Sequence, residues 1–199
     1  MSEQKVRARD NAGGRRRAIL DQAQRIVGER GYHGFGLQEL AERCGLTKPG
    51  LLHYFGSKDR LLIDLLRDRD AQHEAAAHAL LDERCDRHAS ARAQRDSFVA
   101  GLRLIMERNA AQPELTRLQT ILRAEAINGD HPAHGYFMGR EAAKLDLLAD
   151  LVAVFSPAPR STARQVLALM GGLEEQWLRE DRAFDLAAEF DAAIGLIIP

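Results

Sequence analysis

The stretch Gly36–Lys58, GLQELAERCGLTKPGLLHYFGSK, predicts two short helices joined by a tight turn, and it decides how the rest of the chain is interpreted. Apolar residues recur at helical spacing in its first half, at Leu37, Leu40, Ala41 and Cys44. Such spacing gives a helix one apolar face, which packs against a core while the opposite face stays in solvent.

The turn between the two helices has the residues that a sharp change of direction requires. Gly45 ends the first helix, because glycine enters the left-handed conformation without a steric penalty. Thr47 is a favourable N-cap for the second helix, and Pro49 in its first turn lacks an N–H that would be unpaired there anyway. With the small Ala41 opposite, the helices can cross closely, as in a helix-turn-helix that places its second helix in a DNA major groove. By spacing alone, a plain helical hairpin is the alternative.

The flanking sequence extends this pattern into a resemblance to a known family. From Arg16 to Leu62 the chain reads RRAILDQAQRIVGERGYHGFGLQELAERCGLTKPGLLHYFGSKDRLL. This stretch resembles, in order and without gaps, the DNA-binding domain of the TetR family of bacterial transcriptional repressors. The likeness implies an all-α protein whose N-terminal domain binds duplex DNA. The segments that carry it are Ala18-Ile19-Leu20, Gly31-Tyr32, Leu40-Ala41, Gly45-Leu46-Thr47-Lys48, His53-Tyr54-Phe55 and Ser57-Lys58.

Three positions depart from the family pattern. The family usually has Thr or Ser at the position of Gly36, so the first helix of the motif lacks its usual side-chain cap. It usually has Tyr where Leu52 stands, so one hydroxyl that would contact phosphate is missing. Gly50 replaces a commoner Thr, Ser or Ala. These differences concern the contacts with DNA rather than the fold.

The motif and its flanks supply the candidate DNA-contacting residues. Lys48 and His53 can donate to guanine or to phosphate, and the resemblance implies phosphate contact for Lys58. Arginines that open the first helix can contact phosphates, which supply affinity without reading sequence; a solvated helix face is the alternative. The complete set is Arg15, Arg16, Arg17, Gly36, Gln38, Thr47, Lys48, Pro49, Gly50, Leu52, His53, Tyr54 and Lys58.

Composition and charge agree with an all-α, DNA-binding protein. Helix-forming residues are abundant in the 199-residue chain, and no long β-branched run of period two occurs. The net charge is −1, but residues 1–60 have 12 Lys/Arg against 7 Asp/Glu, and the remainder has 16 against 22. The basic half fits attraction to phosphate, whereas chance segregation of surface charge is the alternative.

Other functional classes lack their sequence signals. Cys44 and Cys85 have no CxxC spacing, so no disulfide framework is indicated, and a reducing cytoplasm is expected. The N-terminus lacks the apolar segment of a signal peptide, and no run of about 18 apolar residues predicts a transmembrane helix. His131 and His134 are three apart, but no further Cys or Glu completes a metal site. Without a nucleophile–base set or a phosphate loop, we expect neither an enzyme nor a cofactor.

We expect a flexible basic arm over residues 1–14, a three-helix helix-turn-helix domain over 15–60, and a larger helical ligand-binding and dimerisation domain over 61–199. Gly171 and Gly172 cost an isolated helix about 1 kcal/mol each, so another backbone is expected to pack closely there. Beyond the motif, the apolar spacing predicts helices over Asp59–Arg84, Ala89–Ala111, Glu114–Asn128, Ala133–Phe155, Ser161–Arg179 and Phe184–Ile198.

The last two predicted helices have more apolar surface than one small core uses, which predicts a homodimer interface. The segment LEEQWLREDRAFDLAAEF, Leu173–Phe190, also resembles the C-terminal helix pair that forms the dimer in many TetR-family members. Completion of a monomer core is the alternative. The candidate interface residues are Val166, Leu169, Met170, Leu173, Phe190, Ile194 and Ile197.

The middle helices are expected to enclose a small-molecule site. An apolar, partly flexible lining predicts a neutral or weakly polar hydrophobic effector, oriented by Gln119, Asn128, His134 or Tyr136. A solid core without a cavity is the alternative. The candidate lining is Phe98, Leu102, Met106, Leu118, Ile121, Leu122, His134, Phe137, Met138 and Trp177.

The function expected from these features is that of a dimeric repressor. It would bind a palindromic operator, because a two-fold protein matches a two-fold half-site repeat, and a hydrophobic effector would release it. A DNA-binding regulator that is controlled by a protein partner, or is constitutive, is the alternative.

Overall fold

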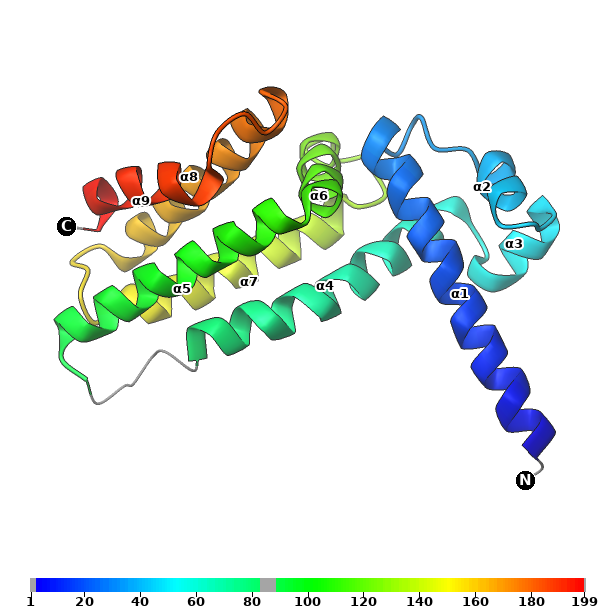
Figure 1. Ribbon diagram of the computed structural model, residues 1–199, viewed down its shortest axis with the longest axis horizontal. Helices are drawn as coiled ribbons and strands as arrows, with labels where there is room; N and C mark the ends of the chain where they lie inside the picture. Colours follow the sequence, from blue (N-terminus) through cyan, green and yellow to red (C-terminus); the bar gives the residue numbers. More distant parts are fainter. Residues whose placement is uncertain (1–2, 83–88, 199) are drawn as a thin grey trace.

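The computed structural model describes residues 3–82 and 89–198, which form nine helices and no strand. The all-α prediction is therefore confirmed; Cys85 lies outside the described residues. Figure 1 shows α2 and α3 beside α1 at one end of the molecule, with α8 and α9 at the other. The helices are α1 (Glu3–Arg30), α2 (Leu37–Arg43), α3 (Lys48–Phe55), α4 (Lys58–Asp82), α5 (Ala91–Ala111), α6 (Pro113–Glu125), α7 (His134–Val152), α8 (Pro159–Arg179) and α9 (Leu186–Ile197).

The ends of the first three helices follow the turn chemistry of the sequence. Gly31 and Gly45 have φ angles of 68° and 63°, so each helix that precedes them ends in a left-handed residue. The Thr47 hydroxyl accepts a hydrogen bond from the Gly50 N–H at 3.2 Å and caps α3. Gly36 precedes α2 without any side-chain cap bond, as expected from its departure from the family pattern.

The N-terminal arm differs from the expectation. Instead of a flexible segment over residues 1–14, α1 begins at Glu3 and continues through Gly13 and Gly14. Most residues between Glu3 and Ala12 are good helix formers, which lets the packed half of α1 extend across two glycines that each cost about 1 kcal/mol.

The helix-turn-helix domain shares its hydrophobic core with later helices. Leu40 of α2 and Leu51 of α3 are fully buried in the same cluster as Leu118 and Leu122 of α6. At Gly28 the two helices α1 and α6 approach so closely that an added Cβ would lie 3.5 Å from a backbone carbonyl oxygen of α6. The core therefore does not stop at residue 60, where the sequence suggests a domain boundary.

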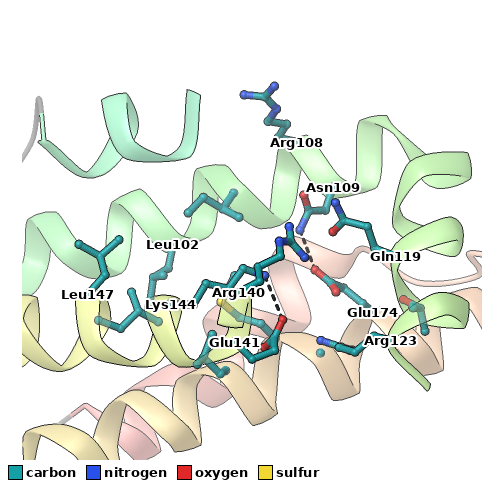
Figure 2. A pocket seen from close by; sticks show the side chains of 16 residues that line it. Leu102, Arg108, Asn109, Gln119, Arg123, Arg140, Glu141, Lys144, Leu147 and Glu174 are labelled. Carbon is teal, nitrogen blue, oxygen red and sulfur yellow. Dashed lines mark hydrogen bonds and ion pairs between the residues drawn. The ribbon is translucent and has the colours of Figure 1, made fainter. Parts of the chain in front are cut away.

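A second core holds the other end of the molecule together. It contains Phe98 of α5, Val152 of α7, Val166 of α8 and Phe190 of α9, all inaccessible to solvent. Between the two cores lies a cavity of about 170 Å³, which α5, α6, α7 and α8 enclose (Figure 2).

The junction between the helix-turn-helix and the second half is fixed by polar contacts around Gly31. The Tyr32 N–H donates to the Glu125 carboxylate at 2.8 Å. The ring of buried His131 packs edge-on against the Tyr32 ring at 5.1 Å, and burial lowers the pKa of His131. Glu125 thus connects the end of α6 with the end of α1.

Replacing Gly31 with Ala should destabilise this junction. The new Cβ would lie 2.2 Å from a Glu125 carboxylate oxygen, at a backbone φ of 68°. A left-handed non-glycine residue costs about 1–2 kcal/mol, so urea denaturation should show at least this loss of unfolding free energy. Gly129→Ala is the control, because a Cβ there meets no atom within 4 Å. Equal stability of the two variants would contradict the assignment.

Candidate nucleic-acid interface and interior cavity

The exposed face of α3 is the candidate nucleic-acid interface. Leu51 and Phe55 anchor the helix in the first core and leave the remaining positions turned outward. Thr47, Lys48, Pro49 and His53 are exposed, whereas Gly50, Leu52 and Tyr54 are half-buried. The helix contains no acidic residue, so this face attracts phosphate rather than repelling it.

Two further segments border this face. Gly36 and Gln38 are exposed at the start of α2, where the Gln38 amide donates to Glu42 at 2.8 Å. Lys58 begins α4, and its Nζ atom lies 4.2 Å from the centre of the Tyr32 ring. Burial lowers the pKa of Lys58, while the nearby carboxylates of Asp59 and Glu125 raise it.

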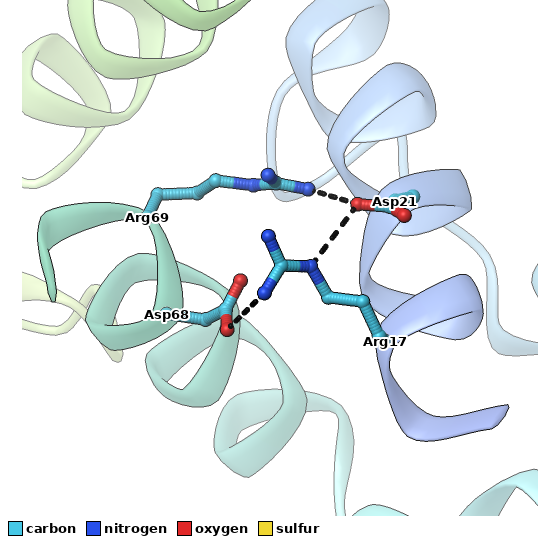
Figure 3. Close-up of polar contacts among 4 residues, drawn as sticks. All are labelled: Arg17, Asp21, Asp68 and Arg69. Atoms are coloured by element: carbon cyan, nitrogen blue, oxygen red, sulfur yellow. Dashed lines mark hydrogen bonds and ion pairs between the residues drawn. The ribbon is translucent and has the colours of Figure 1, made fainter. Parts of the chain in front are cut away.

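The three arginines at the start of the packed part of α1 have different environments. Arg15 is exposed and available to a phosphate. Arg16 donates to Asp64 of α4 at 2.7 Å, while Arg17 pairs with Asp68 of α4 at 3.2 Å (Figure 3). Arg69 of α4 pairs in turn with Asp21 of α1, which also lies 3.7 Å from Arg17. Arg16 and Arg17 therefore join α1 to α4 in this structure, a role that sequence reasoning missed.

Gln119, which the sequence expected to orient the ligand, lines the cavity, but most residues of the predicted apolar lining do not. Leu102 alone of that set borders the cavity. Leu118, Leu122 and Phe137 belong to the first core; Phe98, Met106 and Trp177 belong to the second. Ile121 is half-buried, Met138 is 62% exposed, and the His134 ring is hydrogen-bonded to the Ala126 carbonyl oxygen at 2.8 Å.

The observed cavity has charged walls on several helices. Asn109 of α5 donates to Glu174 of α8 at 2.6 Å, and Lys144 pairs with Glu141 at 3.4 Å within α7 (Figure 2). Burial raises the pKa of Glu174 and lowers the pKa of Lys144. The full lining is Leu102, Ile105, Arg108, Asn109, Gln119, Thr120, Arg123, Arg140, Glu141, Lys144, Leu147, Leu148, Leu167, Met170, Gly171 and Glu174.

One cation of the cavity wall also reaches α4. Arg140 pairs with Asp70 at 2.8 Å, and both side chains are about nine-tenths buried. The Tyr136 hydroxyl donates to the same carboxylate. Asp70 on α4 is therefore held by two residues of α7, one of which faces the cavity.

The glycine pair of α8 has a different partner from the one expected. The three atoms nearest to a Cβ at Gly171 all belong to the Arg123 guanidinium, with one nitrogen at 2.8 Å, and a Cβ at Gly172 would meet nothing within 4 Å. The glycine signal was correct about close approach at Gly171, but a side chain supplies it.

The candidate dimer residues divide between the core and the surface. Val166, Phe190 and Ile194 are buried in the second core, and Met170 lines the cavity, so none of these four faces outward. The half-buried ones are Leu169, Leu173 and Ile197. The outward face of α8 and α9 instead presents Leu196, which is 88% exposed, with the exposed alanines Ala168, Ala188 and Ala192.

Within residues 3–82 and 89–198, no group of three potential metal ligands is found. No helix in those same ranges is both long and apolar enough to cross a membrane.

In comparisons with known proteins, the N-terminal part of the chain is more similar to its relatives than the rest is. Residues 19–65 match the sequence profile described as "Bacterial regulatory proteins, tetR family". The HTH-type transcriptional activator FasR of Mycolicibacterium smegmatis is 25% identical over 178 residues, which cover 86% of this chain and 75% of that protein. The regulator BetI of Rhizobium meliloti is 40% identical over 53 residues, which cover 27% of this chain and only 26% of BetI. Similarity is thus highest over the helix-turn-helix.

Solved structures share the whole fold. The fatty acid degradation regulator FadR of Bacillus halodurans has a TM-score of 0.75 at 17% identity, covering 92% of this chain and 94% of that one. AibR, solved in complex with isovaleryl coenzyme A and operator DNA, has a TM-score of 0.66 at 22% identity, covering 93% and 98%. These likenesses show the fold that this chain shares with them.

The exposed α3 face predicts a measurable loss of phosphate attraction when Lys48 is replaced by Ala. Binding to a selected duplex should weaken, and the slope of log affinity against log salt should decrease by about 1. Fluorescence anisotropy over a range of salt concentrations measures both quantities. Arg92→Ala is the control, because it removes one exposed positive charge from the start of α5. Identical slopes for Lys48→Ala and the unaltered protein would exclude a phosphate contact by Lys48.

Proposed function

This chain belongs to the TetR family of bacterial transcriptional regulators, and from that membership we propose that it represses transcription as an operator-bound homodimer released by an effector. The observation that carries the proposal is the exposed N-terminal half of α3, which the helix-turn-helix presents without any acidic residue. This is the geometry with which a recognition helix enters a major groove. Its natural setting is the bacterial cytoplasm, where the operator is.

Selection of bound sequences from a random duplex pool tests the DNA-binding part. We expect a palindromic site whose half-sites are about one helical turn apart, as a two-fold protein requires. A protein that binds the selected site and random duplex equally would not be an operator-specific regulator.

The homodimer is supported by the outward face of α8 and α9. Leu196 stands beside exposed alanines there, and small residues let helices of two protomers approach closely. A stable interface of this kind buries about 2,000 Å² or more in total. The two helix-turn-helix motifs would then lie at the ends opposite to this face, each available to one half-site (Figure 1).

Replacing Leu196 with Asp should dissociate the dimer and abolish operator binding together. A charge at the centre of an apolar interface is desolvated without a partner, which costs several kcal/mol. Light scattering at micromolar concentration and a gel shift measure the two effects. Ile127→Asp is a matched control, since Ile127 is also strongly exposed, at 82%, but lies between α6 and α7. A dimer that survives Leu196→Asp would place the interface elsewhere.

Effector control is supported by the position of the cavity between the two cores. One face of α6 lines the cavity, and another face of the same helix packs on α1. On α7, Arg140 lines the cavity and pairs with Asp70 of α4. A ligand that attracts Arg140 therefore changes the support of α4, and α4 begins directly after the recognition helix. A shift of this kind alters the spacing of the two motifs in a dimer.

Asp70→Asn tests this connection. Removing one partner of a buried ion pair costs about 3–5 kcal/mol, so chemical denaturation should show a loss in that range. Operator affinity should also fall, because α4 is no longer fixed to α7. Asp146→Asn removes an exposed carboxylate that pairs with Arg160 and should change neither quantity appreciably. Unaltered operator affinity in folded Asp70→Asn would show that this ion pair does not support the DNA-binding state.

Activation is the second candidate outcome, because the relative that covers most of the chain, FasR, is named a transcriptional activator. In vitro transcription from a promoter that carries the selected operator separates the two. Repression predicts that transcript falls as protein is added, and that effector restores it. A protein-controlled or constitutive regulator would bind the operator without responding to any small molecule.

A further inference from the structure

We infer that the cavity is built to hold the acidic group of a small organic anion, with Arg123 as its principal partner. This inference rests on the proposed effector control and replaces the neutral effector that the sequence predicted. Arg108, Arg123, Arg140 and Lys144 line the cavity together with only two carboxylates, Glu141 and Glu174. Figure 2 shows the Arg108 guanidinium directed away from the other labelled charges.

Lys144 and Arg140 each have a carboxylate partner. Lys144 pairs with Glu141 at 3.4 Å, and Arg140 pairs with Asp70 at 2.8 Å. Arg123 forms no ion pair within the described ranges of the chain, although it lines an interior cavity. Its guanidinium acts on the Glu174 carboxylate through charge alone, without a paired contact, and a planar carboxylate would match its N–H donors.

Gly171 shows that the position of Arg123 is specific. A Cβ at this buried residue would lie 2.8 and 2.9 Å from the two terminal guanidinium nitrogens of Arg123. Any other residue at 171 would push the guanidinium aside. The absence of a side chain on α8 therefore makes the space in which the cation from α6 lies.

Neighbouring polar groups complete the proposed binding site for an acidic group. The buried Thr120 hydroxyl lies one turn from Arg123 on α6 and has no hydrogen-bond partner in the described part of the chain. Glu174 faces Asn109 of α5, Arg123 of α6, and the two cations of α7. Burial raises the pKa of Glu174, while the hydrogen bond from Asn109 and the charges of Arg123, Lys144 and Arg140 lower it.

The size and the remaining walls define the rest of the ligand. A cavity of about 150 Å³ with apolar walls holds benzene, so the 170 Å³ here fits a compact body. The remaining lining is apolar. It consists of Leu102, Ile105, Leu147, Leu148, Leu167 and Met170. The ligand class is therefore an acid with an apolar body, such as an aromatic or short aliphatic carboxylate.

Calorimetric titration with matched pairs tests the inference without DNA. Benzoate and isovalerate are compared with benzamide and isovaleramide, which keep the shape and remove the charge. Isovaleryl coenzyme A, the ligand in the AibR structure, is a separate arm that distinguishes a free acid from a thioester whose acidic groups are phosphates. We expect at least one free acid to bind at millimolar concentration or below, and its amide to bind at least about tenfold more weakly.

Three variants give effects of opposite sign. Arg123→Gln and Gly171→Ala should each weaken binding of the acid by about tenfold, the second without any change of charge. Glu174→Gln keeps the acceptor for Asn109 and removes the competing charge, so it should strengthen binding. Circular dichroism and thermal denaturation establish that each variant is folded. Binding of amides as tight as that of acids, failure of both acids and the thioester to bind, or full acid binding by Arg123→Gln would each overturn the inference.

The same samples separate this inference from the proposed function. Acids that bind in calorimetry but leave operator affinity unchanged in a gel shift would refute effector control while confirming the binding site for an acidic group. Neutral compounds that bind and release the operator would confirm effector control and refute the binding site for an acidic group. Binding of the thioester alone would place the recognised charge on phosphate and refute the free-acid class.

Discussion

The packing of α6 against α1 is the constraint on which the other arrangements depend. Leu118 and Leu122 are fully buried between these helices, and each buried leucine stabilises the contact by about 1.5–3 kcal/mol. Thr120 and Arg123 project from the same helix into the cavity. Separating α6 from α1 would expose these leucines, so packing holds the two helices together. The orientation of the recognition helix is thus set partly from outside its own domain.

Buried charge adds a second connection with different physics. A buried ion pair contributes little net stability, because desolvation offsets attraction, but separating its partners is costly. The main effect of the Asp70–Arg140 pair is therefore to fix the position of α4 relative to α7, and its contribution to the stability of the fold is smaller. Apolar packing is not directional, so α1 and α6 stay in contact when they shift slightly against each other. The ion pair tolerates few such shifts, because separating its two charges is costly. The two connections together favour discrete positions of the DNA-binding end over a continuum.

The parts of this structure that follow from neighbouring residues could be predicted from the sequence, and the parts that depend on distant faces could not. Gly45 and Thr47 act within a few residues of themselves, so the turn and the cap were predicted correctly. Apolar periodicity identified inward positions such as Phe98 and Leu118, but it does not say which core receives them. The charged cavity was missed because residues like Arg123 are usually solvated on a helix surface. The sequence signals for it were Gly171, whose partner only the fold reveals, and Gln119, which the sequence named as a polar group near the ligand.

The shared core also has a consequence for protein engineering. A chimera that exchanges residues 15–60 for the corresponding domain of another regulator would keep Leu65 and Leu66 of α4 and the α6 leucines, which were shaped by the removed α1. Its junction would cut through packed side chains rather than through a linker. To exchange operator preference, an engineer has to replace only the outward residues of α3, or transfer the contact surface of α6 together with the helix-turn-helix domain. In this protein, surface residues can therefore be exchanged independently of the core, whereas a contiguous segment of the sequence cannot.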